Sequence, residues 1–255
     1  MPAAKTEPRV DSTLSKGLLI LENLARAKNG KGVTQLSREL ELTKSNTFRL
    51  LQTLTTLGYV KHGADKSYSA TLKTWQVGRH LVENLNLREF AAPEMSILSR
   101  ETGETIYLAV PEGMSVIYIY KVESQKAIRS WNPIGGSAPI HCVGTGKAIL
   151  SANYDRMREI LPKTFEQFTE NTITTLGDLD DDMTTTRERG YAFDTGEFRD
   201  RILSFGAAIV LPDGNAIAAL GISLPDINMT DDGPERIGKL VQQAAHSVSH
   251  KLSRL

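Results

Sequence analysis

Hydrophobic residues recur every three or four positions in three segments near the start of the chain, which is the spacing of amphipathic helices. The predicted helices lie at residues 14–28, 35–40 and 44–57. Thr34 precedes the second helix and Thr43 the third, and a threonine side chain can cap a helix start by accepting a hydrogen bond from a free amide. Gly58 ends the third helix, because glycine readily adopts the left-handed angles of a helix end.

Two short strand-like segments follow these helices. Residues 59–62 and 67–69 alternate in polarity, and Gly63-Ala64-Asp65-Lys66 between them has the composition of a turn. The segments therefore predict a β-hairpin. Three helices with a tight turn between the second and third, followed by a hairpin, predict a winged helix-turn-helix.

The third predicted helix has a polar face without acidic residues. Leu50, Leu54 and Leu57 share its apolar side, and no carboxylate occurs between Lys44 and Thr56. A helix face that meets only solvent usually mixes charges of both signs, whereas an acid-free face suits phosphates and base edges. We expect the residues that enter the DNA major groove to be Lys44, Ser45, Asn46, Arg49 and Gln52. Lys61 and Lys66 of the hairpin should contact phosphate, while Thr34 and Thr43 hold their helices in position.

The rest of the chain mixes helical and strand-like periods and predicts an α+β fold with an antiparallel sheet. Further helices are expected at residues 73–87, 92–100, 147–150, 155–161, 178–190 and 236–252. Strands are expected at residues 106–110, 116–122, 191–194, 204–211 and 216–224. We divide the chain into a disordered tail (1–11), a winged helix-turn-helix domain (12–72), a linker helix (73–88) and an effector-binding and oligomerisation domain (89–255).

Charge separates the two halves of a chain whose net charge is zero. Residues 1–85 hold 13 Lys and Arg against 7 Asp and Glu, whereas residues 86–255 hold 17 against 23. The excess of positive charge in the first part is typical of a domain that meets a polyanion. No apolar run approaches the ~20 residues of a membrane span, and residues 1–11 lack the apolar core of a signal peptide. We therefore expect a cytoplasmic protein without a membrane partner.

The candidates for chemistry in the second half favour binding over catalysis. Gly144-Thr145-Gly146-Lys147 resembles a phosphate-binding loop, but His141 and Ala148 stand where that motif needs Gly and Ser or Thr. What remains is a glycine-rich turn entering a helix, whose free amides favour an anion. Asp194 ends an apolar strand, where a carboxylate is either a structural cap or a ligand contact.

No catalytic or metal-binding set of residues is recognisable in the sequence. His141 and Cys142 are adjacent in an extended segment and should point to opposite faces, so the histidine is badly placed to activate the thiol. Cys142 is the only cysteine, which excludes an internal disulfide and a cysteine-rich zinc site. His246 and His250 have helical spacing but no acidic residue near them in sequence. We predict no catalytic residue, no metal and no cofactor.

Three sequence blocks, in this order, resemble the IclR family of bacterial transcriptional regulators. The winged helix-turn-helix is followed by Pro133-Ile134-Gly135-Gly136, by Pro139-Ile140-His141-Cys142-Val143-Gly144-Thr145-Gly146-Lys147-Ala148, and by Gly190-Tyr191-Ala192-Phe193-Asp194-Thr195-Gly196-Glu197. The resemblance covers about residues 12–252. It implies a DNA-binding N-terminal domain and a GAF-like C-terminal domain that binds a small organic acid or aromatic compound. It also implies assembly into homodimers or dimers of dimers.

The resemblance further implies which residues form the effector pocket. They are Gly144, Thr145, Asp194, Ser204, Gly221 and Ser223. The chain departs from the family pattern at Ser204, where a cysteine is common, and at Arg201, where a glycine is common. Arg129, Arg199 or Arg201 can bind an effector carboxylate with two hydrogen bonds, or all three can face solvent. Of these we place Arg129 and Arg201 in the predicted pocket.

The sequence thus predicts a sequence-specific DNA-binding regulator that recognises a near-palindromic operator as a homo-oligomer. Repression is the commoner activity in the family that it resembles. A small carboxylate or aromatic effector would modulate DNA binding by favouring one quaternary arrangement. Two alternatives stay open at this point. One is a constitutive DNA binder, and the other is a small-molecule hydrolase or lyase fused to a DNA-binding domain, with Asp194, His141 and Ser204 as its candidate residues.

Overall fold

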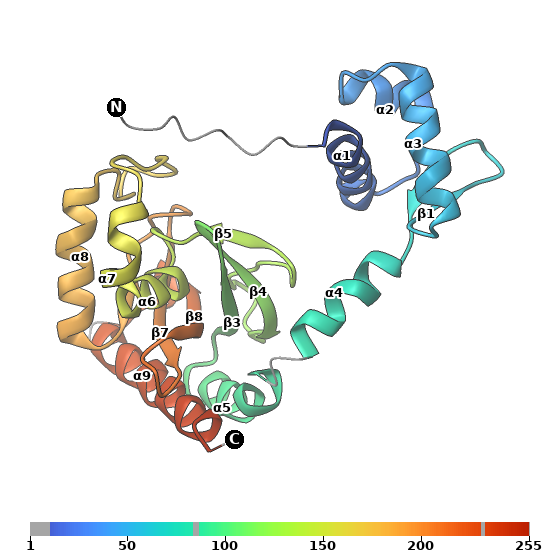
Figure 1. Ribbon diagram of the computed structural model, residues 1–255. Coiled ribbons are helices and arrows are strands. Elements are labelled where there is room, and N and C mark those ends of the chain that lie inside the picture. The colour runs from blue at the N-terminus through green and yellow to red at the C-terminus, as the bar shows by residue number, and fades with distance from the viewer. Residues whose placement is uncertain (1–10, 84–86, 231–232, 255) are drawn as a thin grey trace, which may run out of the picture. The chain divides into compact units, whose positions relative to one another are not determined.

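The computed structural model describes residues 11–83, 87–230 and 233–254, and the chain forms two compact units that divide between residues 84 and 85. The fold is α+β, as the sequence predicts. Figure 1 shows the elements of each unit. Among the described helices, none has the length and apolar character needed to cross a bilayer.

The first unit is a winged helix-turn-helix followed by one more helix. Its elements are α1 (Ser12–Arg26), α2 (Val33–Glu39), α3 (Lys44–Thr56), β1 (Val60–His62), β2 (Tyr68–Ala70) and α4 (Lys73–Glu83). The core of this unit consists of Ile20, Leu21, Leu24, Leu36, Leu50, Leu51, Val60 and Tyr68. Because α1, α2 and β1 all pack around the apolar side of α3, the opposite side of α3 is left on the surface.

Two details of this unit differ from the sequence prediction. Gly32, and not Thr34, is the N-cap of α2, so Thr34 is the second residue of the helix. Leu57, predicted on the buried face of the third helix, is 52% exposed. Leu57 is the C-cap and keeps helical backbone angles, but the core of this unit contains Leu50 and Leu51 of α3 and does not extend to Leu57.

Helix α4 is attached to the end of α3 by side-chain contacts. Lys73 donates a hydrogen bond from Nζ to the carbonyl oxygen of Leu57 at 2.6 Å, and its ammonium group lies 4.9 Å from the ring centroid of Tyr59. Thr71 donates from its hydroxyl to the carbonyl of Gly58. A lysine at a helix C-terminus pairs with unsatisfied carbonyl groups and with the negative end of the helix dipole. These contacts hold the start of α4 against the end of the helix that is predicted to bind DNA.

The second unit is a six-stranded antiparallel sheet with helices on both faces (Figure 1). The strand order is β5-β4-β3-β8-β7-β6. The strands are β3 (Thr105–Glu112), β4 (Ser115–Val122), β5 (Ser137–Pro139), β6 (Ala192–Asp194), β7 (Ile202–Val210) and β8 (Ala216–Pro225). The helices are α5 (Leu87–Thr102), α6 (Gly144–Ala152), α7 (Tyr154–Met157), η1 (Arg158–Ile160), α8 (Leu176–Arg189), η2 (Asp226–Asn228) and α9 (Gly233–Leu252). Strand β5 was not predicted from the sequence, because it has only three residues and pairs at the edge of the sheet.

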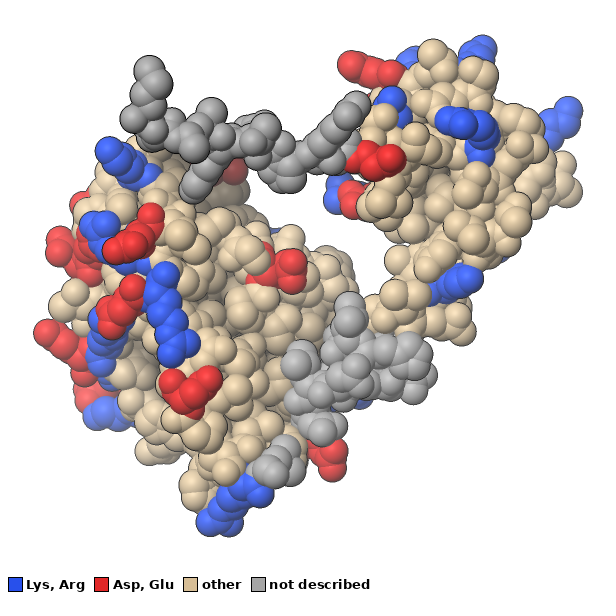
Figure 2. Space-filling model, in the orientation of Figure 1, with Lys and Arg blue, Asp and Glu red and all other residues tan. Residues whose placement is uncertain are grey.

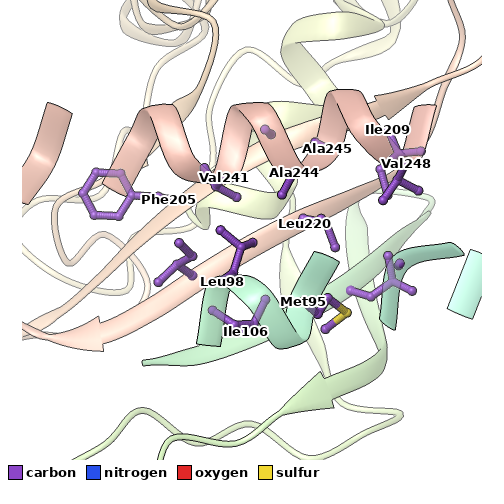
Figure 3. Packing of buried hydrophobic residues seen from close by; sticks show 14 of the residues in the cluster. Met95, Leu98, Ile106, Phe205, Ile209, Leu220, Val241, Ala244, Ala245 and Val248 are labelled. Carbon is purple, nitrogen blue, oxygen red and sulfur yellow. The ribbon is translucent and has the colours of Figure 1, made fainter. Parts of the chain in front are cut away.

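Each face of the sheet has its own hydrophobic core. Figure 3 shows Val241, Ala244 and Val248 of α9 packed toward the sheet, together with Met95 and Leu98 of α5. The opposite face packs against α6, α7 and α8 through residues that include Ile149, Tyr154, Leu179 and Met183. Burial of side chains of this size stabilises the fold by roughly 1.5–3 kcal/mol each relative to exposure. The sheet is therefore a rigid support for any site on its surface.

Candidate functional site

The exposed start of α3 is the candidate DNA-binding surface. Thr43 caps the helix as predicted, because its hydroxyl oxygen accepts a hydrogen bond from the Asn46 amide at 3.3 Å. Lys44, Ser45, Arg49 and Gln52 are exposed, and Asn46 is half-buried. Their placement leaves these groups available to a ligand at the surface of the helix.

The β1–β2 hairpin carries the two lysines predicted to contact phosphate. Lys61 and Lys66 are both exposed. Lys66 has a φ of 64°, in the left-handed region, and the turn is closed by Asp65, which accepts hydrogen bonds from the amide and the hydroxyl of Ser67. Figure 2 shows several Lys and Arg side chains on the visible face of the winged-helix unit. The same view shows acidic groups on both units and, in the second unit, acidic and basic groups side by side. Ion pairs of the second unit join Arg158 to Asp180 and Arg187 to Asp155.

The candidate effector site lies on the face of the sheet that α6 covers. The strand register places Asp194, Ser204, Ser223 and Thr105 in one row across β6, β7, β8 and β3. Residues paired directly in an antiparallel sheet lie on the same face, so these four polar side chains are neighbours. The next row on the same face contains Gly206 and Gly221.

These two glycines let the N-terminus of α6 approach the sheet. A Cβ on Gly206 would lie 2.1 Å from the carbonyl oxygen of Gly144, and a Cβ on Gly221 would lie 2.4 Å from Cγ2 of Thr145. A Cβ on Gly146 would meet the carbonyl oxygen of Ile140 at 2.3 Å. The glycine-rich turn is thus explained by close packing of a helix start on strands β7 and β8, and not by a nucleotide-binding loop.

A cavity of about 30 Å³ lies between the start of α6 and the row of polar residues. Its walls include Tyr107, Tyr118, Asn132, Val143, Thr145, Asp194, Phe198, Arg199, Ile202, Ser204, Phe205, Gly221, Ile222 and Ser223. The hydroxyl oxygen of Thr145 is buried here beside the phenol of Tyr118, and it makes no hydrogen bond of ordinary geometry among the described residues. Val143 is the N-cap of α6 and provides no side-chain hydrogen bond, so amides of the first helical turn stay available.

Asp194 is the acidic group of this cavity and is 3% exposed. Its Oδ1 accepts hydrogen bonds from the amides of Gly196 at 2.9 Å and Glu197 at 2.6 Å. Its Oδ2 accepts from the hydroxyl of Ser204 at 2.6 Å, and the Ser204 oxygen in turn accepts from the amide of Gly144 at 2.9 Å. Burial raises the pKa of Asp194 to about 6, although the hydrogen bonds from Ser204 and Glu197 and the charge of Lys147 oppose the rise.

A buried ion-pair cluster supports the loop that follows Asp194. Lys147 is fully buried and makes an ion pair with Glu197 and another with Asp182, at 3.2 Å. Burial raises the pKa of Glu197 to about 7; the charge of Asp194 adds to the rise, and the charge of Lys147 opposes it. Thr172 donates a hydrogen bond from its hydroxyl to the Glu197 carbonyl at 2.6 Å. The loop that carries Phe198 and Arg199 is therefore fixed to α6, close to the helical turn that begins at the cavity.

Most of the residues that the family resemblance assigned to the pocket come together at this cavity. Thr145, Asp194, Ser204, Gly221 and Ser223 line it, and Gly144 bonds to Ser204 beside it. The structure does not bring Arg129 or Arg201 into its walls. Arg201 lies in the turn before β7 with a φ of 61°, and its side chain pairs on the surface with Asp226 at 3.1 Å. Arg129 is exposed and donates to the carbonyl of Lys126.

Arg199, Asn132 and two tyrosines line the cavity although the predicted pocket does not contain them. The guanidinium of Arg199 donates to the carbonyl of Trp131 at 3.0 Å, and the hydroxyl of Tyr107 accepts from the Asn132 amide at 2.8 Å. Burial raises the pKa of Tyr118 and of Tyr107, which keeps both phenols protonated near neutral pH. Arg199 is one of the three arginines that the sequence offers for a carboxylate. The sequence alone does not identify the two tyrosines as site residues, because only the pairing of β3 with β4 and β8 brings them to the site.

The buried histidine and cysteine near α6 do not form a nucleophilic pair. Burial raises the pKa of the Cys142 thiol, and neighbouring acidic groups raise it further, so the thiolate is disfavoured. Burial lowers the pKa of His141, whose ring stacks on Phe165 at 4.7 Å between centroids. Within the described residues, no group of three or more His, Cys, Asp or Glu side chains has the arrangement of a metal site.

Two family models match the chain. The model for the "Bacterial transcriptional regulator IclR C-terminal" matches residues 79–250, and that for the "IclR helix-turn-helix domain" matches residues 13–63. The transcriptional regulator KdgR of Escherichia coli is 31% identical over 96% of this chain and 94% of its own length. The acetate operon repressor of Salmonella typhimurium is 32% identical over 97% and 93%, respectively.

Solved structures resemble the fold across both units. IclR of Thermotoga maritima has a TM-score of 0.77 at 26% identity and covers 94% of this chain and 98% of its own. An IclR homologue from Microbacterium hydrocarbonoxydans, solved in complex with 4-hydroxybenzoate, has a TM-score of 0.80 at 21% identity. It covers 96% of this chain and 100% of its own, and at this identity the likeness concerns the fold alone.

Proposed function

We propose how this protein works on the premise that the chain belongs to the IclR family of bacterial transcriptional regulators. It is therefore a DNA-binding transcriptional regulator and not an enzyme. The proposal concerns the residues that carry this function. The start of α3 reads the operator through Lys44, Ser45, Asn46, Arg49 and Gln52. Lys61 and Lys66 of the hairpin hold the phosphate backbone, and Thr34 and Thr43 lie at the starts of helices α2 and α3 beside it.

The protein would act in the cytoplasm as a homodimer or a dimer of dimers on a near-palindromic operator, because two identical helix-turn-helix units read two half-sites. The domains proposed from the sequence are a winged helix-turn-helix at 12–72, a linker helix at 73–88 and an effector domain at 89–255. In the structure, α4 of this linker ends at Glu83, and Leu87 already belongs to α5 and to the core of the second unit. Repression is the proposed activity, in line with the name of the Salmonella relative.

The cavity beside α6 is the proposed effector site. One observation carries this assignment: the buried Thr145 hydroxyl, beside the Tyr118 phenol, makes no hydrogen bond of ordinary geometry among the described residues and lies at a helix start whose free amides favour an anion. Arg199 adds a positive charge to the cavity wall, while Asp194, Ser204, Ser223 and Gly221 form its floor. These groups suit a carboxylate that also carries a hydroxyl or keto group.

The size of the cavity favours a small effector. A volume of about 30 Å³ equals the space of roughly two ordered waters. A carboxylate group fits this space without rearrangement, whereas an aromatic ring requires movement of the cavity walls. We therefore propose a small aliphatic acid as the effector class. The 4-hydroxybenzoate complex of the Microbacterium homologue is consistent with an acid in a site of this fold.

A thermal-shift screen with small carboxylates tests the effector site. A ligand that binds only the folded protein raises its stability by ~2.7 kcal/mol at a hundredfold excess over Kd. We expect Thr145→Val to abolish the shift, because the substitution removes the free hydroxyl and keeps the shape of the side chain.

Thr186→Val is the matched control for that experiment. Thr186 is also buried with an unpartnered hydroxyl among the described residues, but it lies in α8 and lines a different hollow. The control should keep the full shift. No shift with any carboxylate in the wild-type protein would contradict the effector proposal and favour a constitutive DNA binder.

A further inference from the structure

We propose that this domain binds its carboxylate effector together with one proton, which is held between Asp194 and Ser204. The inference rests on the proposed effector site and adds a regulatory property to it. It would make the protein respond to the effector and to pH through the same pair of side chains.

Two hydrogen-bond donors lie at this part of the cavity floor, the Ser204 hydroxyl and the Gly144 amide, and both already donate to protein atoms. With Asp194 ionised, the Ser204 hydroxyl must donate its only proton to Oδ2 of Asp194, at 2.6 Å. The amide of Gly144 donates to the Ser204 oxygen at 2.9 Å and is occupied as well. The floor therefore presents oxygen lone pairs and a negative charge to the cavity. A bound carboxylate would be repelled by this arrangement.

One added proton reverses the arrangement without moving a heavy atom. A proton from solvent binds Oδ2 of Asp194, which becomes a donor to the Ser204 oxygen. The Ser204 hydroxyl hydrogen then leaves Asp194 and turns to an effector carboxylate oxygen in the cavity. The Ser204 oxygen has two lone pairs, so it accepts from both Asp194 and the Gly144 amide in this state. One O–H bond forms on Asp194 while the hydronium ion or buffer acid that gives the proton loses its bond to it, and the total charge of the site with its anionic ligand stays unchanged from the empty ionised site.

The groups around Asp194 bring its pKa close to physiological pH. The charged or titratable groups that face it are Lys147 of α6, Glu197 and Arg199 of the following loop, Tyr118 of β4 and Cys142 before α6, with Asp182 of α8 beyond Lys147. Burial is the largest influence and raises the pKa of Asp194 to about 6. The negative charge of an effector at contact distance raises it further, so that the proton binds with the ligand at neutral pH.

The identity of residue 204 matters for this mechanism. A serine hydroxyl is a full donor and acceptor, whereas a thiol is a weak one. Residue 204 of this chain is a serine, so its side chain can accept two hydrogen bonds and donate one. Its partner Asp194 is held by two backbone amides and cannot turn away from Ser204 without losing both hydrogen bonds.

Isothermal titration calorimetry of the full-length protein tests the proposal with acetate, lactate and 4-hydroxybenzoate as probes. Measurements at neutral pH in imidazole and in Tris, which differ in ionisation enthalpy, count the protons taken up on binding. We expect an uptake close to one proton per site. The Kd should rise about tenfold per pH unit between the pKa of the empty site and the higher pKa of the ligand-bound site, and it should stay constant below the first value.

Asp194→Asn is the decisive variant because it imitates the protonated state. The asparagine keeps an acceptor for the two amides and presents an NH₂ donor to Ser204. We expect it to bind the probes without proton uptake, with a Kd independent of pH, and more tightly than wild type at about pH 8. Asp213→Asn, in the β7–β8 turn, replaces an exposed aspartate whose side chain caps the Asn215 amide, and should behave as wild type.

The possible results separate this inference from the proposed effector site. Binding of a probe without proton uptake would refute the inference and leave the effector site intact. Uptake that persists in Asp194→Asn would place the proton on another group, such as Glu197, and would refute it as well. If no probe binds wild type at millimolar concentration, the effector proposal fails and the inference fails with it. The wild-type proton count needs no variant, so a folding defect in Asp194→Asn leaves the test decisive.

Discussion

Lys147 has no exposed surface and makes an ion pair with Glu197, three residues after the cavity acid Asp194. The pair joins α6 to the loop that carries Phe198 and Arg199. Removing one partner of a buried ion pair leaves the other charged and unpaired, which typically costs ~3–5 kcal/mol. We expect Lys147→Met to lower the free energy of unfolding by about this amount, measured by urea denaturation.

An exposed ion pair provides the control for this prediction. Lys239 pairs with Glu235 one turn away on α9, and both side chains are more than half exposed. Surface pairs of this type contribute ~0–1 kcal/mol. Lys239→Met should therefore change stability little. Equal effects of the two substitutions would show that burial of the Lys147 pair does not determine its importance.

Arg49 is the residue of α3 whose loss should most clearly affect operator recognition. Its side chain is exposed on the face without acidic residues. A bidentate arginine contact to a base is worth ~1–3 kcal/mol of discrimination, so Arg49→Ala should weaken specific operator binding about 10- to 100-fold. Electrophoretic mobility shifts with operator and unrelated DNA measure this loss. Arg156→Ala, an exposed arginine of the second unit, should keep specific binding. Retained operator preference in Arg49→Ala would remove Arg49 from the reading face.

The winged helix-turn-helix was predictable from the sequence because its signals are local. Helical spacing places α1 and α3, Thr43 caps α3 as expected, and the turn at Gly63 and Asp65 joins two short strands. The errors are also local in origin. Gly32 is the N-cap of α2 in place of Thr34. The extended backbone ends at Gly32, so the helix begins two residues earlier than it would with Thr34 as the cap.

The effector site could be predicted only in part. Asp194, Ser204 and Gly221 follow from the resemblance to a family with a known pocket, and the strand register brings them together. Tyr107 reaches the site only because β3 pairs with β8 across more than a hundred residues of sequence. Arg201 was placed in the pocket because it stands at a position where a glycine is common in the family pattern, but the sequence does not show that its side chain pairs with Asp226 on the surface.

Gly206 should tolerate no side chain, because the start of α6 packs directly on it. A Cβ at this position would lie 2.3 Å from the carbonyl carbon of Gly144 and 2.7 Å from the amide nitrogen of Thr145. Both are backbone atoms, so the helix itself would have to move. Overpacking of this kind costs ~1–3 kcal/mol or more. Gly206→Ala should lower the melting temperature and abolish carboxylate-induced stabilisation in the thermal-shift assay.

A glycine with open surroundings is the control for that substitution. Gly177 lies in the first turn of α8, and a Cβ added there would have the Thr175 hydroxyl oxygen as its nearest neighbour, at 4.0 Å. Alanine favours helix over glycine by up to ~1 kcal/mol. Gly177→Ala should be neutral or stabilising. If Gly206→Ala proved equally harmless, the close approach of α6 to β7 would not be essential.

The pH dependence of stability tests the state of Asp194 without any ligand. Its pKa in the folded protein, about 6, exceeds the ordinary value of 3.8, so the folded state binds more protons than the unfolded state between these values. Stability from this group is therefore present at low pH and is lost as the pH rises through about 6. Asp194→Asn removes this loss. The charge of Asp194 also raises the pKa of Glu197. The substitution therefore also reduces the loss of stability with rising pH that comes from Glu197.

Urea unfolding of wild type and Asp194→Asn between about pH 5 and pH 8 should consequently give curves that are not parallel. A shift of one pKa unit corresponds to ~1.4 kcal/mol. We expect the free energy of unfolding of the variant to rise by about 1 kcal/mol relative to that of the wild type across this pH range. His141, whose pKa is lowered by burial, titrates in both proteins and cancels in the comparison. Parallel curves would mean that Asp194 keeps an ordinary pKa in the folded protein, and they would remove the physical basis for a proton shared with Ser204.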